Sequence, residues 1–148
     1  MIGIIVTGHG EFASGLKSAL SVIAGEQEKI CFVDFLVNHS SDDLSNNLNA
    51  AFKELSDTEG VLVLSDLAGG SPFKISAELI VTNNYKAKLI AGTNIAMLLE
   101  ASLARNFNDL ETLASNLIDT GKESVMLLDL AALNKPKNDD DDDENEGI

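Results

Sequence analysis

Short apolar runs alternate along this chain with longer segments of helical periodicity, and this alternation is the strongest constraint on its fold. Four runs are rich in β-branched residues and almost continuously hydrophobic, as strands covered on both faces are: residues 2–8, 29–37, 60–66 and 87–92. Strands joined by helical crossovers pair in parallel, and those crossovers are right-handed. The pattern therefore predicts an α/β fold, an open parallel sheet with helices on both faces.

The segments between the runs carry helix start and stop signals. Five helices are predicted, with these signals: 16–24 stopped by Gly25, 41–55 capped by Ser40 or Ser41, 72–79 opened by Pro72, 94–105 capped by Asn94, and 108–118 opened by Asn108 and ended by Gly121. A last apolar run, SVMLLDL at 124–130, is predicted to be a strand. The pattern alone does not place that strand in the sheet.

Composition suits one domain with one hydrophobic core. Of the 148 residues, 45% are hydrophobic and only 23% are charged. No apolar run approaches the roughly 20 residues that span a bilayer, and no signal segment opens the chain, so we expect a cytoplasmic protein. The single cysteine, Cys31, lies in an apolar run and is expected to be a buried, reduced thiol without a chemical role.

The formal net charge of −14 disfavours binding to nucleic acid or to an anionic membrane, because both are polyanions. Residues 134–148 hold two lysines, five aspartates and two glutamates, which leaves −9 for residues 1–133. Such a self-repelling run cannot bury apolar surface. We therefore expect a domain at 1–133, with its boundary near Leu133, and a disordered acidic tail at 134–148.

Two loops after predicted strands carry unusual sequences, TGHGEFA at 7–13 and SDLAGGSPF at 65–73. In open parallel sheets, ligands bind beyond the carboxyl ends of the strands, where the strand order reverses. If the first and third strands are neighbours, as in the flavodoxin-like order 2134, His9 and Asp66 reach the same crevice. The central prediction is that these two side chains meet.

A histidine beside a carboxylate has a clear chemical use. An aspartate that accepts a hydrogen bond from Nδ1 fixes the tautomer and leaves the Nε2 lone pair free to attack phosphorus. The second loop supplies donors for phosphate oxygens, because Gly69 and Gly70 allow close backbone approach, Ser71 offers a hydroxyl and an N–H, and Pro72 opens a helix whose dipole favours anions. This scheme needs no metal and no cofactor.

Four segments, GHGEFASGL, GEQEKICFVDF, SDLAGGSPF and IAGTNIAMLLEA, occur in order between residue 2 and about residue 130. Together they resemble the IIA component of mannose-type sugar phosphotransferase systems. The resemblance implies that His9 accepts a phosphoryl group from HPr and passes it to a IIB component, which delivers it to sugar entering through the membrane components IIC and IID. It also implies that Asp66 orients His9 and that Ser71 lies in the phosphate-facing loop.

The same resemblance implies a homodimer in which the last strand, antiparallel, is exchanged into the sheet of the other subunit. In this family the domain is often fused to IIB, whereas this chain ends in the acidic tail, so we expect IIB to be a separate polypeptide. Phe12 and Leu67 lie beside the two loops and are candidates for contact with a partner protein, although core packing would explain them equally well. The sugar is not determined by the sequence.

Other functions fit the sequence less well. Gly8, Gly10 and Ala13 spell the GxGxxA of a dinucleotide-binding loop, with Asp34 near the position of the ribose-binding acid, but Asp34 lies inside a predicted strand. A receiver domain would use Asp66 as acceptor but needs acidic residues after the first strand to bind magnesium, and the segment IIVTGHG contributes no carboxylate. No GxSxG motif indicates a serine hydrolase. His39, the second histidine, is expected to be solvated.

Overall fold

The computed structural model describes residues 1–134 and residue 136, and it contains one fully parallel four-stranded sheet. The strands are β1 (Gly3–His9), β2 (Ile30–Phe35), β3 (Val61–Ser65) and β4 (Ala87–Ile90), in the order β2-β1-β3-β4. This order confirms the predicted flavodoxin-like sheet. It places the carboxyl ends of β1 and β3 side by side, with Thr7 opposite Ser65 in the register.

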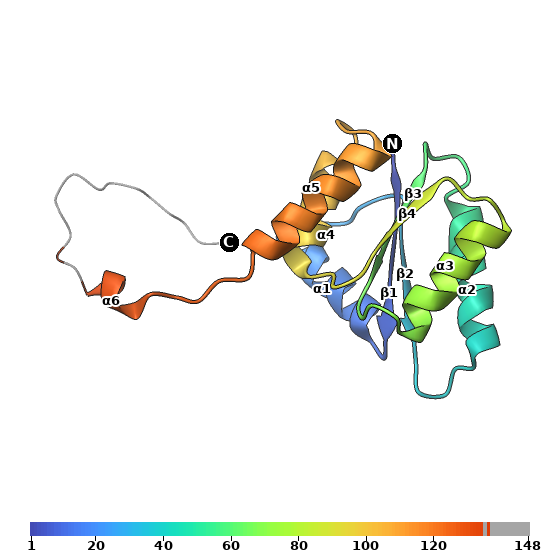
Figure 1. Cartoon of the computed structure of the whole chain (residues 1–148), viewed down its shortest axis with the longest axis horizontal. Coiled ribbons are helices and arrows are strands. Elements are labelled where there is room, and N and C mark those ends of the chain that lie inside the picture. The colour runs from blue at the N-terminus through green and yellow to red at the C-terminus, as the bar shows by residue number, and fades with distance from the viewer. Residues whose placement is uncertain (135, 137–148) are drawn as a thin grey trace.

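Helices cover both faces of the sheet, as Figure 1 shows. One layer contains α1 (Phe12–Ala24), α4 (Ile95–Ala104) and α5 (Leu110–Glu123), and the other contains α2 (Ser41–Glu54) and α3 (Ser71–Thr82). Within the part of the chain that is described, no helix is long and apolar enough to cross a membrane.

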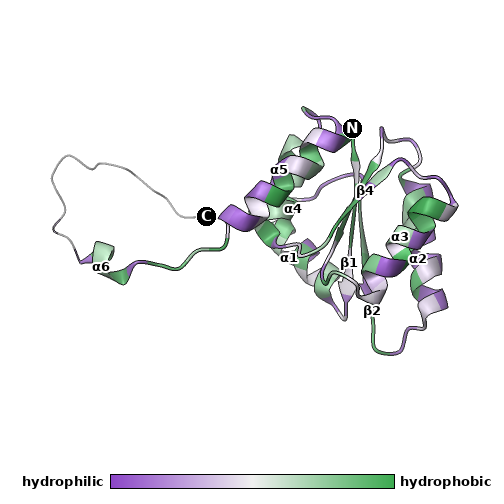
Figure 2. Cartoon of the chain, in the orientation of Figure 1, coloured by the Kyte–Doolittle hydropathy of each residue, from purple (hydrophilic) through white to green (hydrophobic). Residues whose placement is uncertain are grey.

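Successive strand residues face opposite layers, and this alternation divides the core into two clusters. Ile4 and Val6 of β1 pack with α1, α4 and α5, whereas Ile5 packs with α2 and α3. Both clusters are fully buried along β1 and β3, which explains why these strands are hydrophobic at nearly every position. Figure 2 shows mostly hydrophobic strands between helices that mix hydrophobic and hydrophilic residues.

The predicted caps of two helices are confirmed, and both predicted ends of the helix at 108–118 are wrong. Ser40 caps α2 and Asn94 caps α4 through side-chain hydrogen bonds. The cap of α5 is Asp109, not Asn108, and α5 continues through Gly121 to Glu123. A Cβ at Gly121 would lie 2.7 Å from Sδ of Met97, so this glycine allows α4 and α5 to approach closely and does not stop the helix.

The run predicted as a fifth strand forms no strand among the described residues. Residues 125–129 have no regular structure, and a four-residue helix, α6 (Leu130–Leu133), follows them (Figure 1). The large apolar side chains between residues 125 and 133 are all more than half exposed, and Leu127 is 95% exposed. Exchange of this segment between subunits stays a prediction. The predicted acidic tail, 134–148, lies outside the described residues except for residues 134 and 136.

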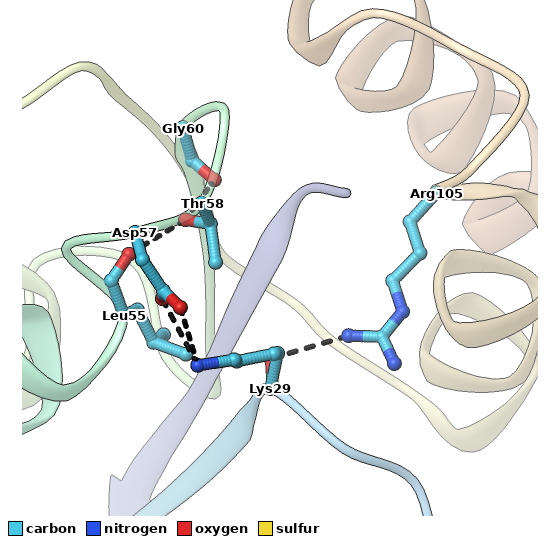
Figure 3. Close-up of polar contacts among 6 residues, drawn as sticks. All are labelled: Lys29, Leu55, Asp57, Thr58, Gly60 and Arg105. Carbon is cyan, nitrogen blue, oxygen red and sulfur yellow. Dashed lines mark hydrogen bonds and ion pairs between the residues drawn. The ribbon is translucent and has the colours of Figure 1, made fainter.

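A buried arginine ties together the amino-terminal end of the sheet. Arg105 follows α4 and is only 2% exposed, and its guanidinium donates hydrogen bonds to the carbonyl oxygens of Glu28 (2.6 Å), Lys29 (3.2 Å) and Ile2 (3.5 Å). Figure 3 shows the contact with Lys29, whose ammonium group pairs with Asp57. One side chain thus links α4, the start of β1 and the turn before β2, at the end of the sheet opposite the two loops.

Candidate functional site

His9 and Asp66 lie in contact at the carboxyl edge of the sheet, as predicted. His9 is the last residue of β1, and Asp66 directly follows β3. One carboxylate oxygen, Oδ2 of Asp66, lies 2.7 Å from Nδ1 of His9 and accepts the backbone N–H of His9 at 2.8 Å. The histidine side chain is 47% exposed and the aspartate side chain 17%. The Asp66 carboxylate therefore holds the Nδ1 side of the His9 ring, while the ring itself is exposed to solvent.

The hydrogen bonds of Asp66 keep it ionised. Burial raises the pKa of this carboxyl group, but hydrogen bonds from the His9 N–H, the His9 ring and the Leu67 N–H (2.7 Å), together with the attraction of the His9 ring, outweigh burial and hold its pKa below the usual value. An ionised Asp66 accepts a proton-bearing Nδ1. The lone pair of neutral His9 then lies on Nε2, and among the described residues no group hydrogen bonds to Nε2.

The start of α3 lies directly against the His9 ring. Gly70 occupies the N-cap position, and Ser71 is the first helical residue. A Cβ at Gly70 would lie 2.7 Å from Cε1 and 3.4 Å from Nε2 of His9. No side chain caps this helix, and its first N–H groups have no partner within the helix. The start of α3 therefore offers free N–H donors beside Nε2, which favours an anion there.

The other predicted site residues differ in exposure. Gly69 has a φ of +78°, a left-handed conformation that allows the loop to turn sharply into α3. Phe12 is half-buried and packs on the core over Gly8, where a Cβ would lie 2.4 Å from its ring. Leu67 is 63% exposed beside the site. Of the two candidates for partner contact, Leu67 thus presents more surface, and Phe12 has a clear packing role.

Sequence reasoning missed the residues at the end of β2. The ring of Phe35 lies 6.0 Å from the His9 ring, at an angle of 56°, and the Phe35 carbonyl accepts the N–H of Gly10 at 2.7 Å. Asp34 accepts the N–H of Ser14, in the first turn of α1, at 2.9 Å. The sequence signal for this contact was the single carboxylate of Asp34 near the end of an apolar strand. His39 was expected to be solvated, yet it is half-buried and its Nδ1 accepts the N–H of Leu36 at 3.1 Å.

Within residues 1–134 and 136, no group of three or more histidine, cysteine, aspartate or glutamate side chains is placed to hold a metal ion.

The fold and the site define a flavodoxin-like α/β domain that presents an exposed imidazole, oriented by a carboxylate, beside an uncapped helix start. The family model described as EIIA-man, PTS system fructose IIA component, matches residues 3–118. The chain belongs to this family of phosphotransferase system IIA components. This is the mannose family that the sequence motifs resemble. Its members carry phosphoryl groups in sugar phosphotransferase systems.

Known relatives agree with this assignment. The chain is 36% identical over 131 residues to the mannose-specific EIIAB component of Escherichia coli strain K12, covering 86% of this chain and 39% of that protein. It is 30% identical over 127 residues to the fructose-specific EIIA component of Bacillus subtilis, covering 86% of each. The crystal structure of component EIIA from Streptococcus agalactiae superposes with a TM-score of 0.78 at 36% identity, covering 86% of this chain and 97% of that one. The chain thus spans about two fifths of the E. coli relative.

The alternative of a dinucleotide-binding module is not supported. Asp34, the candidate ribose ligand of such a module, accepts a hydrogen bond from the Ser14 N–H at the start of α1. The ring of Phe12 covers Gly8 within the GxGxxA loop. The loop that resembles a pyrophosphate cradle instead presents His9.

Proposed function

We propose that His9 is the phosphoryl acceptor of this IIA component and that Asp66 orients its ring. The observation that carries the proposal is the 2.7 Å contact between Nδ1 and the Asp66 carboxylate, with the ring exposed. In the proposed step, the Nε2 lone pair forms a bond to phosphorus, and the bond between phosphorus and the atom of the donor breaks. The proton on Nδ1 stays between the ring and Asp66, which stabilises positive charge as it develops on the imidazole.

The start of α3 is the proposed phosphate-binding element. Its first N–H groups and the Ser71 hydroxyl would donate hydrogen bonds to the oxygens of the phosphoryl group on Nε2, and Gly69 and Gly70 would let the backbone approach that group. Family membership supports phospho-HPr as the donor and a IIB component as the acceptor. Leu67 and the exposed edge of Phe12 are proposed contacts for these proteins. Delivery of the phosphate to a sugar that enters through the membrane components IIC and IID stays a prediction.

The experiment is phosphorylation with phosphoenolpyruvate, enzyme I and HPr. We expect a phosphate that is labile in acid and stable in base, located on His9 by mass spectrometry. His39→Ala provides the matched control, because it removes the chain's second histidine, which lies in the turn before α2. If His9→Ala labels as fully as the wild type, or if the label depends on His39, the acceptor is not His9.

We also propose that the chain forms a homodimer through residues 124–130. Four consecutive apolar side chains of this segment are more than half exposed: Val125, Met126, Leu127 and Leu128. Exposed apolar runs of this kind mark interaction surfaces. Strand exchange with a second copy would bury them and would pair their backbone with an edge of the partner's sheet.

A further inference from the structure

Helix α1 begins without a cap of its own, and its cap comes from a neighbouring strand. Glu11 occupies the N-cap position but makes no side-chain hydrogen bond to the helix. The Ser14 N–H, in the first turn, is instead bonded to Oδ1 of Asp34 at 2.9 Å. Asp34 lies on β2, where its Cα pairs with that of Gly8. A carboxylate 20 residues away thus performs the task that a local serine or aspartate usually performs.

The residue after Asp34 holds the same loop at a second point. The Phe35 carbonyl accepts the Gly10 N–H at 2.7 Å, which forms an isolated bridge just beyond the end of β1. Gly10 has a φ of +58°, so the chain turns sharply there, directly after His9. Two adjacent residues of β2 therefore restrain the segment that leaves His9, one through a backbone carbonyl and one through a carboxylate.

On the other side, Asp66 restrains His9 itself through its backbone N–H and its ring. The loop of residues 9–14 is thus held between the carboxyl ends of β2 and β3. We propose that Asp34 is a positioning residue for phosphoryl transfer, because its carboxylate anchors the start of α1 and with it the loop that carries His9. This inference rests on the proposed role of His9 as acceptor.

Precise placement of the attacking atom matters strongly in such a reaction. Displacement of a reacting group by about 1 Å can cost about a hundredfold in rate. Without the Asp34 anchor, the first turn of α1 loses a cap, and the loop after His9 keeps only the Phe35 carbonyl on that side. The ring keeps its contact with Asp66, so we expect a smaller loss than that maximum.

Three substitutions distinguish the anchoring of α1 by Asp34 from the effect of its charge and from a general loss of protein stability. Asp34→Ala removes the hydrogen bond and the charge, whereas Asp34→Asn removes the charge but keeps an oxygen that can accept the Ser14 N–H. Asp109→Ala is the matched control, because Asp109 caps α5 through the Thr112 N–H at 2.7 Å in the same way but lies at the opposite end of the sheet. The rate of transfer from saturating phospho-HPr is measured in a single turnover for each.

We expect Asp34→Ala to slow transfer by about tenfold, Asp34→Asn to stay within about twofold of the wild type, and Asp109→Ala to transfer at the wild-type rate despite a similar loss of thermal stability. Hydrogen exchange at the Ser14 amide should quicken in Asp34→Ala and not in Asp34→Asn. If Asp34→Ala does not fold, Ser14→Pro removes the same donor in the first turn, where proline is tolerated, and should slow transfer likewise.

Each contrary result is distinct. Wild-type protein that carries no phosphate on His9 overturns the proposed function. Wild-type protein that labels at His9 while Asp34→Ala transfers equally fast overturns the role of Asp34. A transfer rate in Asp34→Asn as low as in Asp34→Ala would mean that the charge of Asp34 matters and its anchoring does not. Slow transfer in Asp109→Ala would mean that lost stability alone explains the effect. Either result would also overturn the proposed role of Asp34.

Discussion

Gly70 and His9 lie so close together that no side chain fits between them. A Cβ built on Gly70 would lie 2.7 Å from Cε1 of the ring, although the two residues are far apart in the sequence. Contacts shorter than 3.0 Å are not found for real Cβ atoms, so one of the two groups would have to move. The start of α3 and the exposed imidazole therefore lie in direct contact. The backbone conformation does not require a glycine at position 70, because a φ of −71° is open to any residue. The contact with the ring is what requires it.

Gly70→Ala should slow phosphoryl transfer by about a hundredfold, because the new methyl group would push the His9 ring and the start of α3 apart. The measurement is the single-turnover rate from phospho-HPr. Gly15→Ala is the control, because Gly15 lies in α1 with open space around it, and an alanine there should raise helix stability by up to about 1 kcal/mol without changing the rate. Equal rates for the two variants would refute a close approach of α3 to the reacting ring.

Asp66→Asn should slow transfer by about a hundredfold or more while the protein stays folded. The carboxylate accepts three hydrogen bonds, two on Oδ2 and one on Oδ1, and an amide replaces one of these oxygens by a group that cannot accept. The ring then loses its orienting partner or its stabilising charge. Asp57→Asn is the control, since Asp57 is exposed and pairs with Lys29 at the other end of the sheet. Nitrogen chemical shifts of His9 should report a changed tautomer in Asp66→Asn alone; unchanged shifts and rates would leave Asp66 with a structural role only.

Arg105→Met should lower the free energy of unfolding by about 3 kcal/mol, because three backbone carbonyls lose a buried donor while the side-chain volume is retained. Urea denaturation measures the change. Arg105→Lys should recover only part of it, since an ammonium group does not reproduce the fork of the guanidinium. A loss below about 1 kcal/mol in Arg105→Met would show that these carbonyls find other partners.

Cys31 should react slowly with iodoacetamide at pH 8. Burial, and after it the charge and hydrogen bond of Glu54, raise the pKa of the thiol to about 11, so the reactive thiolate is scarce until the pH approaches that value. Alkylation should be about a hundredfold slower than for a free thiol and should accelerate with rising pH. Glu54→Gln should quicken the reaction, whereas Glu59→Gln should not, because the Glu59 carboxylate pairs with the amino terminus of Met1 and does not act on the thiol. Alkylation as fast as in a model peptide would contradict the raised pKa.

Leu127→Glu should convert a dimer into a monomer, as measured by sedimentation velocity. A charge at this position would have to be buried in the exchanged strand, which is costly without a partner. Val81→Glu is the control, because Val81 is exposed to a similar degree on α3. A wild-type chain that sediments as a monomer at all concentrations would end the proposal of strand exchange.

The order of the elements and the identity of the central pair could be predicted because each depends on local sequence. Continuous apolar runs indicated buried parallel strands, and the helical crossovers between them restricted the topology to a few forms. His9 ends β1 and Asp66 directly follows β3, so adjacency of β1 and β3 was enough to bring them together. The predicted stop at Gly121 failed for the converse reason, because a glycine needed for contact with Met97 looks the same in sequence as a glycine that ends a helix.

The sequence by itself determined the α/β class, the two loops and the imidazole with its carboxylate, because periodicity and side-chain chemistry are properties of neighbouring residues. Only the tertiary structure decided that Gly70 touches the ring, that Asp34 anchors α1 and that Phe35 holds the loop after His9. These contacts depend on the register of β2 against β1 and on the path of α3, which are set when the strands and helices pack and bury their apolar faces together.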